Sequence, residues 1–357
     1  MQLTSRFSKP TPLPVETTRC PRLTRSHTTR TRRSQSLRLL CLCSALLISF
    51  TAVLAHAQDY TSIVVFGDSL SDTGNFADLT QDKYGVRIPG PVANYTDGRF
   101  TDGDDTSPAA QKYFGLWIEQ FAAMLPSKPP IKNSLDGGTN YAYGNATNGN
   151  GTATIHFGPS NSLSVNVNNI GQQITDYLAT SPEITHKTLF AVWGGANDIL
   201  AANSADDIIK AAIAQAINIQ RLIDAGATQF IIPNIPPLGS TPLLSGSPKT
   251  SIPATAAAVL YNQALAAALS ILRDFNFDKH LHFVQLDVFS LFNQVVASPA
   301  KYSLTNVTAS AQGIATIDPD TYLFWDDIHP TTSGHNILAV SAADAIAASE
   351  CRAALCR

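Results

Sequence analysis

The chain has 357 residues, with 24 basic and 27 acidic side chains and a formal net charge of −3. Nine basic residues and one acidic residue lie in residues 1–57, which leaves 15 basic and 26 acidic residues, a net charge of −11, in residues 58–357. This acidic, lysine-poor composition argues against nucleic acid or an anionic membrane surface as a partner.

Residues 1–57 have the pattern of a secretory signal. A basic segment reaches Arg38, a sixteen-residue apolar run covers residues 39–54, and Ala55-His56-Ala57 follows as a small-x-small site. The apolar run is shorter than the roughly 20 residues that span a membrane, which argues against a stable membrane anchor. We expect cleavage after Ala57, secretion to the exterior or the periplasm, and a mature domain of residues 58–357.

Other interpretations of this leader remain open. The length of its basic part, and its Ser, Thr and Arg content, are also typical of an organelle transit sequence. A misassigned start would explain the length as well. Arg32-Arg33 raises a twin-arginine signal, although the residues after the pair fit it poorly. The remaining cysteines, Cys351 and Cys356, leave a terminal disulfide undecided, because an i,i+5 pair in a continuous helix does not face correctly.

After the leader, short apolar runs alternate with helical patterns. We expect strands near residues 62, 140, 189, 229 and 282, helices at 115–125, 168–179, 204–226, 254–275 and 332–348, and long loops at 81–106 and 144–164. The buried face expected for the 204–226 helix consists of Ile208, Ile209, Ala212, Ile213, Ala216, Ile217 and Leu222. The alternation predicts one α/β domain, a three-layer α/β/α sandwich with a flavodoxin-like five-stranded parallel sheet.

Ser69 follows the first of these strands. The run at residues 63–66 is β-branched and aromatic and ends at Gly67, so Ser69 stands where parallel sheets place their ligands. Such a serine is a candidate nucleophile, but it needs a nearby base and donors for the oxyanion it creates.

A candidate base lies near the C-terminus. Asp326 and His329 are three residues apart, so their side chains can meet on one turn, and an aspartate there fixes the imidazole tautomer that accepts a serine proton. Asp327 points off that face. A polar turn before a helix gives the same pattern, so DxxH alone is weak. His335 is expected to be structural, and no spacing of the other histidines suggests a metal site.

Two further strands end in candidate oxyanion donors. Asn197 follows the third strand and Gly144 the second. In the strand order 2-1-3-4-5, the first and third strands are neighbours, so the Asn197 amide and Ser69 share the crevice at the switch point. Gly144 would offer a backbone N–H with no side chain in the way. Ordinary turns also contain both sequences.

At this point the motifs match a known family. The chain resembles the GDSL or SGNH hydrolases, which include secreted lipases and esterases, over residues 62–348. Four blocks occur in the order of the family: residues 66–75 (FGDSLSDTGN), 140–146 (NYAYGNA), 194–198 (GGAND) and 326–330 (DDIHP). Tyr143 and Asn145 stand where small residues are commoner. Residues 236–239 (PPLG) and 97–100 (DGRF) resemble further pieces of the lipase-like branch.

The resemblance implies an ester hydrolase that needs no cofactor. Ser69 would be the nucleophile, His329 the base and then the acid, and Asp326 its orienting carboxylate. The N–H groups of Ser69 and Gly144, with the Asn197 amide, would form the oxyanion hole. The expected partner is an ester (a lipid, a short-chain ester or an acetylated sugar), and we expect a monomer.

Several activities share this constellation of residues. Lipase, phospholipase, acyltransferase and carbohydrate acetyl esterase activities all remain open. An inactive binding module would usually have lost a member of the triad, and none is missing. A dinucleotide-binding enzyme is disfavoured, because no GxGxxG follows a strand.

Overall fold

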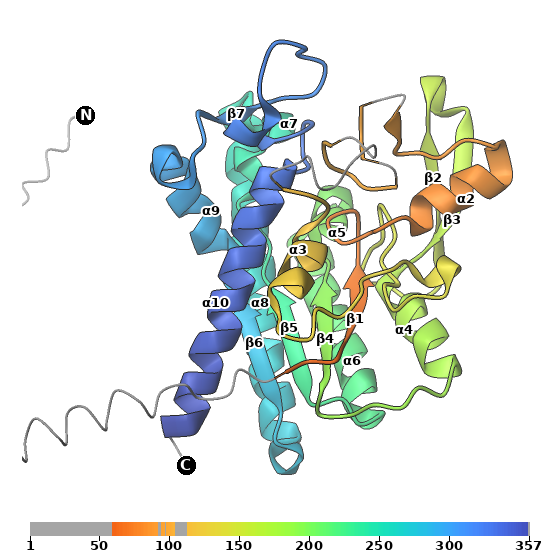
Figure 1. Ribbon diagram of the computed structural model, residues 1–357, viewed down its shortest axis with the longest axis vertical. Helices are drawn as coiled ribbons and strands as arrows, with labels where there is room; N and C mark the ends of the chain where they lie inside the picture. The colour runs from red at the N-terminus through yellow and green to blue at the C-terminus, as the bar shows by residue number, and fades with distance from the viewer. Residues whose placement is uncertain (1–58, 92–93, 97, 104–112, 356–357) are drawn as a thin grey trace, which may run out of the picture. The chain divides into compact units, whose positions relative to one another are not determined.

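The computed structural model describes residues 59–355 except 92–93, 97 and 104–112, and the side chains as far as residue 350 (Figure 1). The predicted signal segment, Asp97, the Cys351 side chain and Cys356 lie outside the described residues. The expectations of a leader and of a terminal disulfide therefore stay predictions.

A parallel sheet forms the centre of the domain. Its strands, in spatial order, are β1 (Ser62–Gly67), β4 (Thr188–Trp193), β5 (Gln229–Pro233) and β6 (His282–Leu286). All three pairings are parallel. The run of buried side chains along β1 and β4 is what a parallel sheet covered on both faces requires.

The strand predicted near residue 140 lies in the expected place but is irregular. Residues 139–143 run beside β1, where Val65 N–H donates to Thr139 O (3.0 Å) and Tyr141 N–H donates to Val65 O (2.8 Å). Only an isolated parallel bridge, Val65 with Asn140, results. The outer side of Asn140 is paired with a turn, because its N–H donates to Lys132 O and its carbonyl accepts from Ser134. The order is thus 2-1-3-4-5, with four regular strands instead of five.

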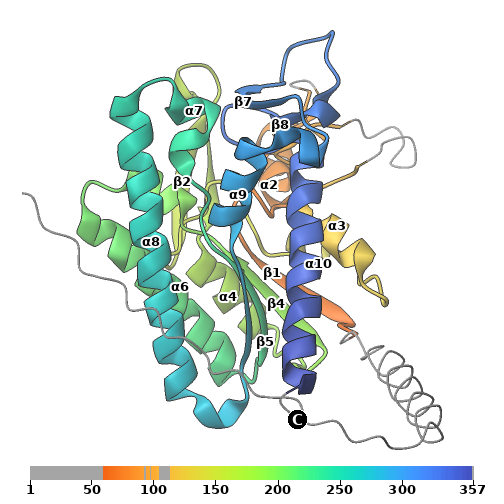
Figure 2. The same cartoon turned by 90° about the vertical axis from the view of Figure 1, so that its left-hand side faces the viewer.

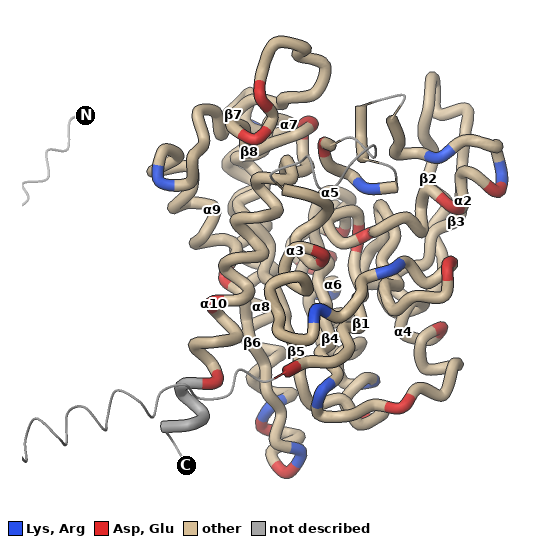
Figure 3. The backbone as a smooth tube through the Cα atoms, viewed as in Figure 1, with Lys and Arg blue, Asp and Glu red and all other residues tan. Residues whose placement is uncertain are grey.

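Helices cover both faces of the sheet (Figure 2). One face carries α4 (Ile170–Ala179), α6 (Ala205–Asp224) and α8 (Pro248–Phe275), and the other carries α3 (Trp117–Met124) and α10 (Thr332–Leu355). The predicted three-layer α/β/α architecture is therefore confirmed. Acidic and basic residues are dispersed over the described elements (Figure 3).

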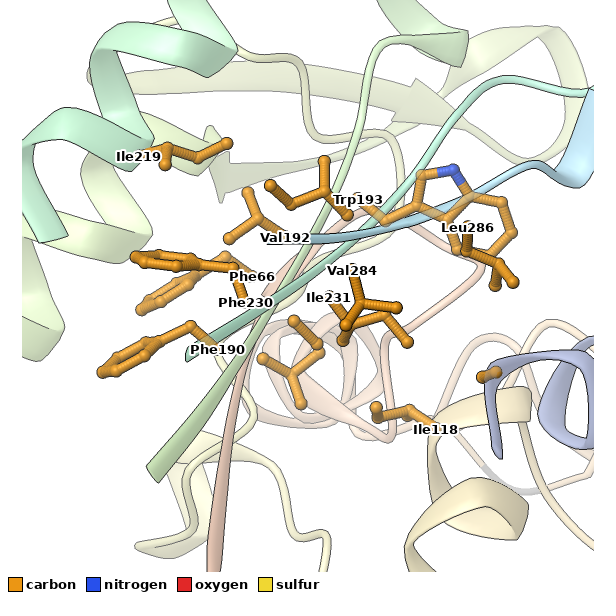
Figure 4. Packing of buried hydrophobic residues seen from close by; sticks show 14 of the residues in the cluster. Phe66, Ile118, Phe190, Val192, Trp193, Ile219, Phe230, Ile231, Val284 and Leu286 are labelled. Atoms are coloured by element: carbon orange, nitrogen blue, oxygen red, sulfur yellow. The ribbon is translucent and has the colours of Figure 1, made fainter. Parts of the chain in front are cut away.

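Alternate side chains of the strands enter the two layers of the core (Figure 4). Phe66, Phe190 and Phe230 lie together on the side of α6, and the rings of Phe190 and Phe230 are 5.7 Å apart. On the other side, Ile231 and Val284 point towards α3. Because this core is closely packed, it holds the carboxyl ends of the strands, and the loops that follow them, in fixed positions.

The long helix α8 is apolar enough in length and composition to cross a membrane, the one such helix among the described residues. It packs against α6 and buries Ala258, Tyr261, Leu265 and Leu269. It begins at Pro248, six residues before the predicted start, because the Ser247 side chain accepts from Lys249 N–H and caps it.

The buried face of α6 differs from the predicted one. Ile213 and Ile217 are 45% and 57% exposed, whereas Gln215 and Asn218 are buried. These two amides replace apolar groups because each finds a backbone acceptor: Gln215 donates to Val192 O (3.2 Å) and Asn218 to Asn148 O (2.9 Å).

Several elements lie in segments for which no helix or strand was predicted. They are α2 (Asn75–Tyr84), the antiparallel hairpin β2 (Thr152–Phe157) and β3 (Leu163–Asn168), α5 (Ala196–Ala201), α7 (Pro242–Ser245), α9 (Val288–Ala297), β7 (Asn306–Ser310) and β8 (Tyr322–Phe324). The hairpin packs against α2 in a small separate core around Phe76 and Val167. The segment predicted as a loop at 81–106 therefore begins in α2, and the prediction of a loop at 144–164 is wrong for β2 and for the start of β3.

Candidate active site

Ser69 and His329, 260 residues apart, meet at the carboxyl end of β1. Ser69 lies in a turn in which Ser71 N–H and Asp72 N–H both donate to Asp68 O (3.0 Å each). The His329 Nε2 atom is 2.9 Å from Ser69 Oγ, and its Nδ1 atom is 2.7 Å from Asp326 Oδ2. The structure therefore brings the predicted serine, histidine and aspartate into one hydrogen-bonded series.

The Asp326 carboxylate is held by its own turn. Its Oδ1 accepts from Ile328 N–H (2.8 Å) and His329 N–H (2.7 Å). These two hydrogen bonds hold the carboxylate in place beside the imidazole three residues further along the chain. Burial raises the pKa of Asp326, but the attraction of His329 and these hydrogen bonds outweigh burial and lower the pKa to about 2. Asp326 is therefore ionised over the whole range in which a histidine titrates.

Tyr95 is a fourth donor to this carboxylate, and sequence reasoning missed it. The Tyr95 hydroxyl donates to Asp326 Oδ2 over 2.7 Å, on the same oxygen that faces His329. Its ring packs edge-on against Trp325 at 6.2 Å. By contrast, Asp327 is exposed and accepts from the Ser310 hydroxyl (2.6 Å), so it takes no part in the series.

The imidazole of His329 rests on an aromatic ring. The rings of Phe100 and His329 are 5.1 Å apart and inclined by 34°. Phe100 follows Arg99, whose guanidinium makes two hydrogen bonds to Glu119, of 2.8 and 2.7 Å. This part of the 97–100 block therefore positions a wall of the site.

Asn197 lies at the start of α5, directly after β4. Its Nδ2 atom donates to Ala146 O (3.0 Å), which leaves the second amide hydrogen for another acceptor. The turn before it has Gly195 at φ 118°, and a Cβ there would meet the Tyr261 ring at 2.3 Å. A glycine at this position thus lets the chain turn tightly enough to present Asn197 beside Ser69.

The prediction for Gly144 needs a correction. Its N–H is buried and donates to Asp72 Oδ2 (2.8 Å), the carboxylate that also accepts from the first N–H groups of α2. The Gly144 N–H is therefore already used in a hydrogen bond and is directed away from Ser69. The next residue, Asn145, is exposed, lines the same cavity as Ser69 and has φ 65°. The hydrogen bonds found among the described residues leave the Asn145 N–H unused.

A cavity of about 190 Å³ opens beside these groups. Ser69, Asn145, Asn197 and His329 line one part of it, and apolar side chains from α5, α9, β8 and α10 line the rest. Among the described residues, no cluster of three or more His, Cys, Asp or Glu side chains has the arrangement of a metal site.

The sequence of most of the domain matches a family model. The model describes GDSL-like lipases and acylhydrolases and aligns with residues 63–341. The chain belongs to this family. The match includes the turn that holds Ser69, the start of α5 and the turn that holds Asp326 and His329.

Relatives of this GDSL-like hydrolase have several names. It is 26% identical to Lipase 1 of Photorhabdus luminescens, over 82% of this chain and 51% of the relative. It is 25% identical to a phosphatidylcholine-sterol acyltransferase of Aeromonas hydrophila, over 85% and 95%, and 27% identical to an acetylesterase of Thermothelomyces thermophilus, over 79% and 87%.

Other matches are longer proteins or more distant structures. A Pseudomonas putida protein from the trpE-trpG intergenic region is 27% identical over 83% of this chain and 50% of its own length, so the chain spans about half of it and of Lipase 1. Among solved structures, the carbohydrate acetylesterase Est24 of Sinorhizobium meliloti is 14% identical, with a TM-score of 0.42, over 80% of this chain and 98% of Est24.

The Asp68 carboxyl beside Ser69 predicts a pH dependence of stability. Burial raises the pKa of Asp68 from 3.8 to about 7, although the Leu70 N–H and the charge of His329 lower it. Between pH 4 and 7 the folded protein keeps a proton that the unfolded chain releases. This group therefore makes the free energy of unfolding fall by up to about 4 kcal/mol as the pH rises through that range.

We expect Asp68→Asn to lack this fall, because an amide does not titrate and its oxygen still accepts from Leu70. The measurement is urea unfolding of the wild type and the variant from pH 4 to 8. The difference in free energy should grow in favour of the variant as the pH rises. If the free energies of unfolding of the wild type and the variant changed in parallel with pH, the prediction would be contradicted.

Proposed function

We propose that this GDSL-like hydrolase cleaves carboxylic esters through an acyl-enzyme on Ser69. The observation that supports the proposal most directly is the hydrogen-bonded series from Ser69 Oγ through His329 to Asp326, beside a cavity. Asp326 accepts from the Nδ1–H of His329, which leaves Nε2 to take the Ser69 proton as Oγ attacks the ester carbonyl. The protonated His329 then gives this proton to the departing alcohol.

The developing oxyanion needs donors on the far side of the carbonyl from His329. We propose the N–H of Ser69, the free amide hydrogen of Asn197 and, in place of Gly144, the N–H of Asn145. Donors fixed before the reaction cost no reorganisation, so they stabilise the transition state more than the ground state. Water, activated by His329, then hydrolyses the acyl-enzyme, and no cofactor enters these steps.

The experiment that tests the proposal is hydrolysis of p-nitrophenyl acyl esters by the full chain, run beside acetylated sugars and a phospholipid. Release of p-nitrophenol that depends on Ser69 supports it, and no turnover of any ester contradicts it. A second outcome, transfer of the acyl group to an added alcohol, would place this chain with its acyltransferase relative. The same acyl-enzyme serves both reactions.

Asn197→Ala is expected to lower kcat about 10²–10³-fold with KM nearly unchanged, because its amide acts once charge develops on the carbonyl oxygen. Steady-state kinetics on one p-nitrophenyl ester provides the measurement. Asn203→Ala, in the exposed turn between α5 and α6, is the matched control and should keep wild-type kinetics. An Asn197→Ala variant with raised KM and normal kcat would show that this amide holds substrate instead.

Export is a separate proposal. We propose cleavage after Ala57 and secretion, on the basis of the basic segment, the short apolar run and the Ala-His-Ala site.

A further inference from the structure

We propose that the apolar part of the cavity beside Ser69 binds the acyl chain of the ester, and that the preferred substrates carry medium-length aliphatic acyl groups. This inference rests on the proposed ester hydrolysis and names its substrate class. It separates this chain from an acetyl esterase, which needs space for a single methyl group beyond the carbonyl.

The walls of the cavity continue from the site into the core. Beyond Ser69 and His329, it is lined by one face of α9 and by residues of β8 and α10: Val288, Leu291, Phe292, Val295, Leu323 and Leu338. Val295 and Leu323 are 2% and 4% exposed, so they form an inner wall, whereas Leu291 and Phe292 are half-buried. The lining therefore extends from the candidate nucleophile to buried apolar side chains.

Few polar groups interrupt this lining, although Trp193 also lines the cavity and its buried Nε1–H has no hydrogen-bond partner among the described residues. Thr241 lines the cavity, but its hydroxyl donates to Leu238 O (2.7 Å) and offers no hydrogen to a ligand. A sugar ring would leave most of its hydroxyl groups without partners in such a space, at a considerable desolvation cost. An aliphatic chain suits this part of the cavity, and the sugar of an acetylated carbohydrate does not.

The size of the cavity argues in the same direction. Its volume is about 190 Å³, whereas one water molecule needs roughly 10–15 Å³ of this kind of space. An acetyl group would leave most of it empty. A chain of several methylene groups would fill it, and each buried methylene should raise kcat/KM about fourfold, the change that corresponds to about 0.8 kcal/mol.

The acyl side of the ester fits the pocket better than the alcohol side. The alcohol must leave past His329, which protonates it, and burial in the apolar pocket would retain it. The acyl group stays bound to Ser69 until water attacks, so its chain gains binding without delaying release of the alcohol. Binding energy from this remote part of the substrate also orients the carbonyl for attack.

The first experiment varies the acyl chain and keeps the leaving group constant. With p-nitrophenyl acetate, butyrate, hexanoate and octanoate, we expect kcat/KM to rise with length until the cavity is filled. Methyl octanoate and heptyl acetate, which are isomers, then separate the two sides of the ester, and we expect methyl octanoate to be hydrolysed faster. A preference for acetate, or for heptyl acetate over methyl octanoate, would overturn the inference.

Variants on α9 test the position of the chain. Leu291→Trp should narrow the cavity and lower the octanoate-to-acetate ratio of kcat/KM at least tenfold. Phe292→Ala should widen it and shift the preferred chain to a greater length. Gln294→Trp adds the same bulk to the solvent face of α9 and should leave the ratio unchanged. Thermal unfolding shows which variants fold. If Leu291→Trp does not fold, Phe292→Ala is the deciding variant. An unchanged dependence of kcat/KM on acyl-chain length in Phe292→Ala would contradict the inference.

A binding measurement separates this inference from the proposed function. Calorimetric titration of octanoate and acetate into the full chain requires no turnover. We expect octanoate to bind, acetate not to bind, and Leu291→Trp to weaken octanoate at least tenfold. If octanoate binds in this way but no ester is hydrolysed, the proposed function is contradicted, whereas binding of an aliphatic chain in the cavity is supported. If esters are hydrolysed through Ser69 but octanoate does not bind, the proposed function is supported and binding of the acyl chain in the cavity is contradicted.

Discussion

Ser69→Ala is expected to lower kcat for ester hydrolysis by about 10⁵–10⁶-fold, because no other group lies at the position from which Oγ attacks. His329→Ala should have a similar effect, since Ser69 then lacks its base. The two residues act as one unit, so the double variant should be no slower than either single variant. Steady-state kinetics on a p-nitrophenyl ester, with unfolding measured in parallel, provides the test.

Ser71→Ala is the matched control in the same turn. The Ser71 hydroxyl accepts from the Trp117 indole (3.0 Å) and is buried, away from the cavity lining. Its loss should cost about 1–3 kcal/mol of stability, because the indole N–H is left without a partner, and should leave kcat within a few-fold of wild type. If Ser71→Ala were inactive and Ser69→Ala active, the nucleophile would be wrongly identified.

The elements that the sequence predicts well are those with strong local patterns. The apolar runs of β1, β4 and β5 and the capped start of α6 needed no tertiary information. The segment at 288–297 is only ten residues long and was not predicted as a helix, although its apolar residues Val288, Leu291, Phe292 and Val295 recur at helical spacing. This spacing could have indicated the helix, but its contact with β8 and α10 around the cavity is long-range and does not follow from local sequence.

In the candidate site, too, contacts between residues close in the sequence could be predicted, and contacts between distant residues could not. Asp326 and His329 are close in the chain, so their contact follows from the geometry of one turn. Tyr95 reaches Asp326 across 231 residues, and nothing in its local sequence indicates this. We propose Asn145 in place of Gly144 because the Gly144 N–H donates to Asp72, a long-range contact. The available signal was an asparagine at a position of the family block where small residues are commoner, since asparagine tolerates positive φ better than most residues.

Asp326→Asn is expected to lower kcat by about 10⁴-fold while the fold is retained. An asparagine oxygen at the Oδ1 position still accepts from the N–H groups of Ile328 and His329, so the turn survives. The group that then faces His329 Nδ1 is an NH₂, which can only donate. The imidazole must therefore carry its proton on Nε2, where it can no longer accept the proton of Ser69.

Asp327→Asn is the matched control, one residue along the same turn. Its carboxylate is exposed and accepts from Ser310, so the variant should keep kcat within about threefold of wild type, as surface changes usually cost little. Kinetics of both variants from pH 5 to 9 is the measurement. If Asp327→Asn were the inactive variant and Asp326→Asn the active one, the orienting carboxylate would be Asp327. The hydrogen bond between His329 Nδ1 and Asp326 would then have no role in the chemistry, however short it is.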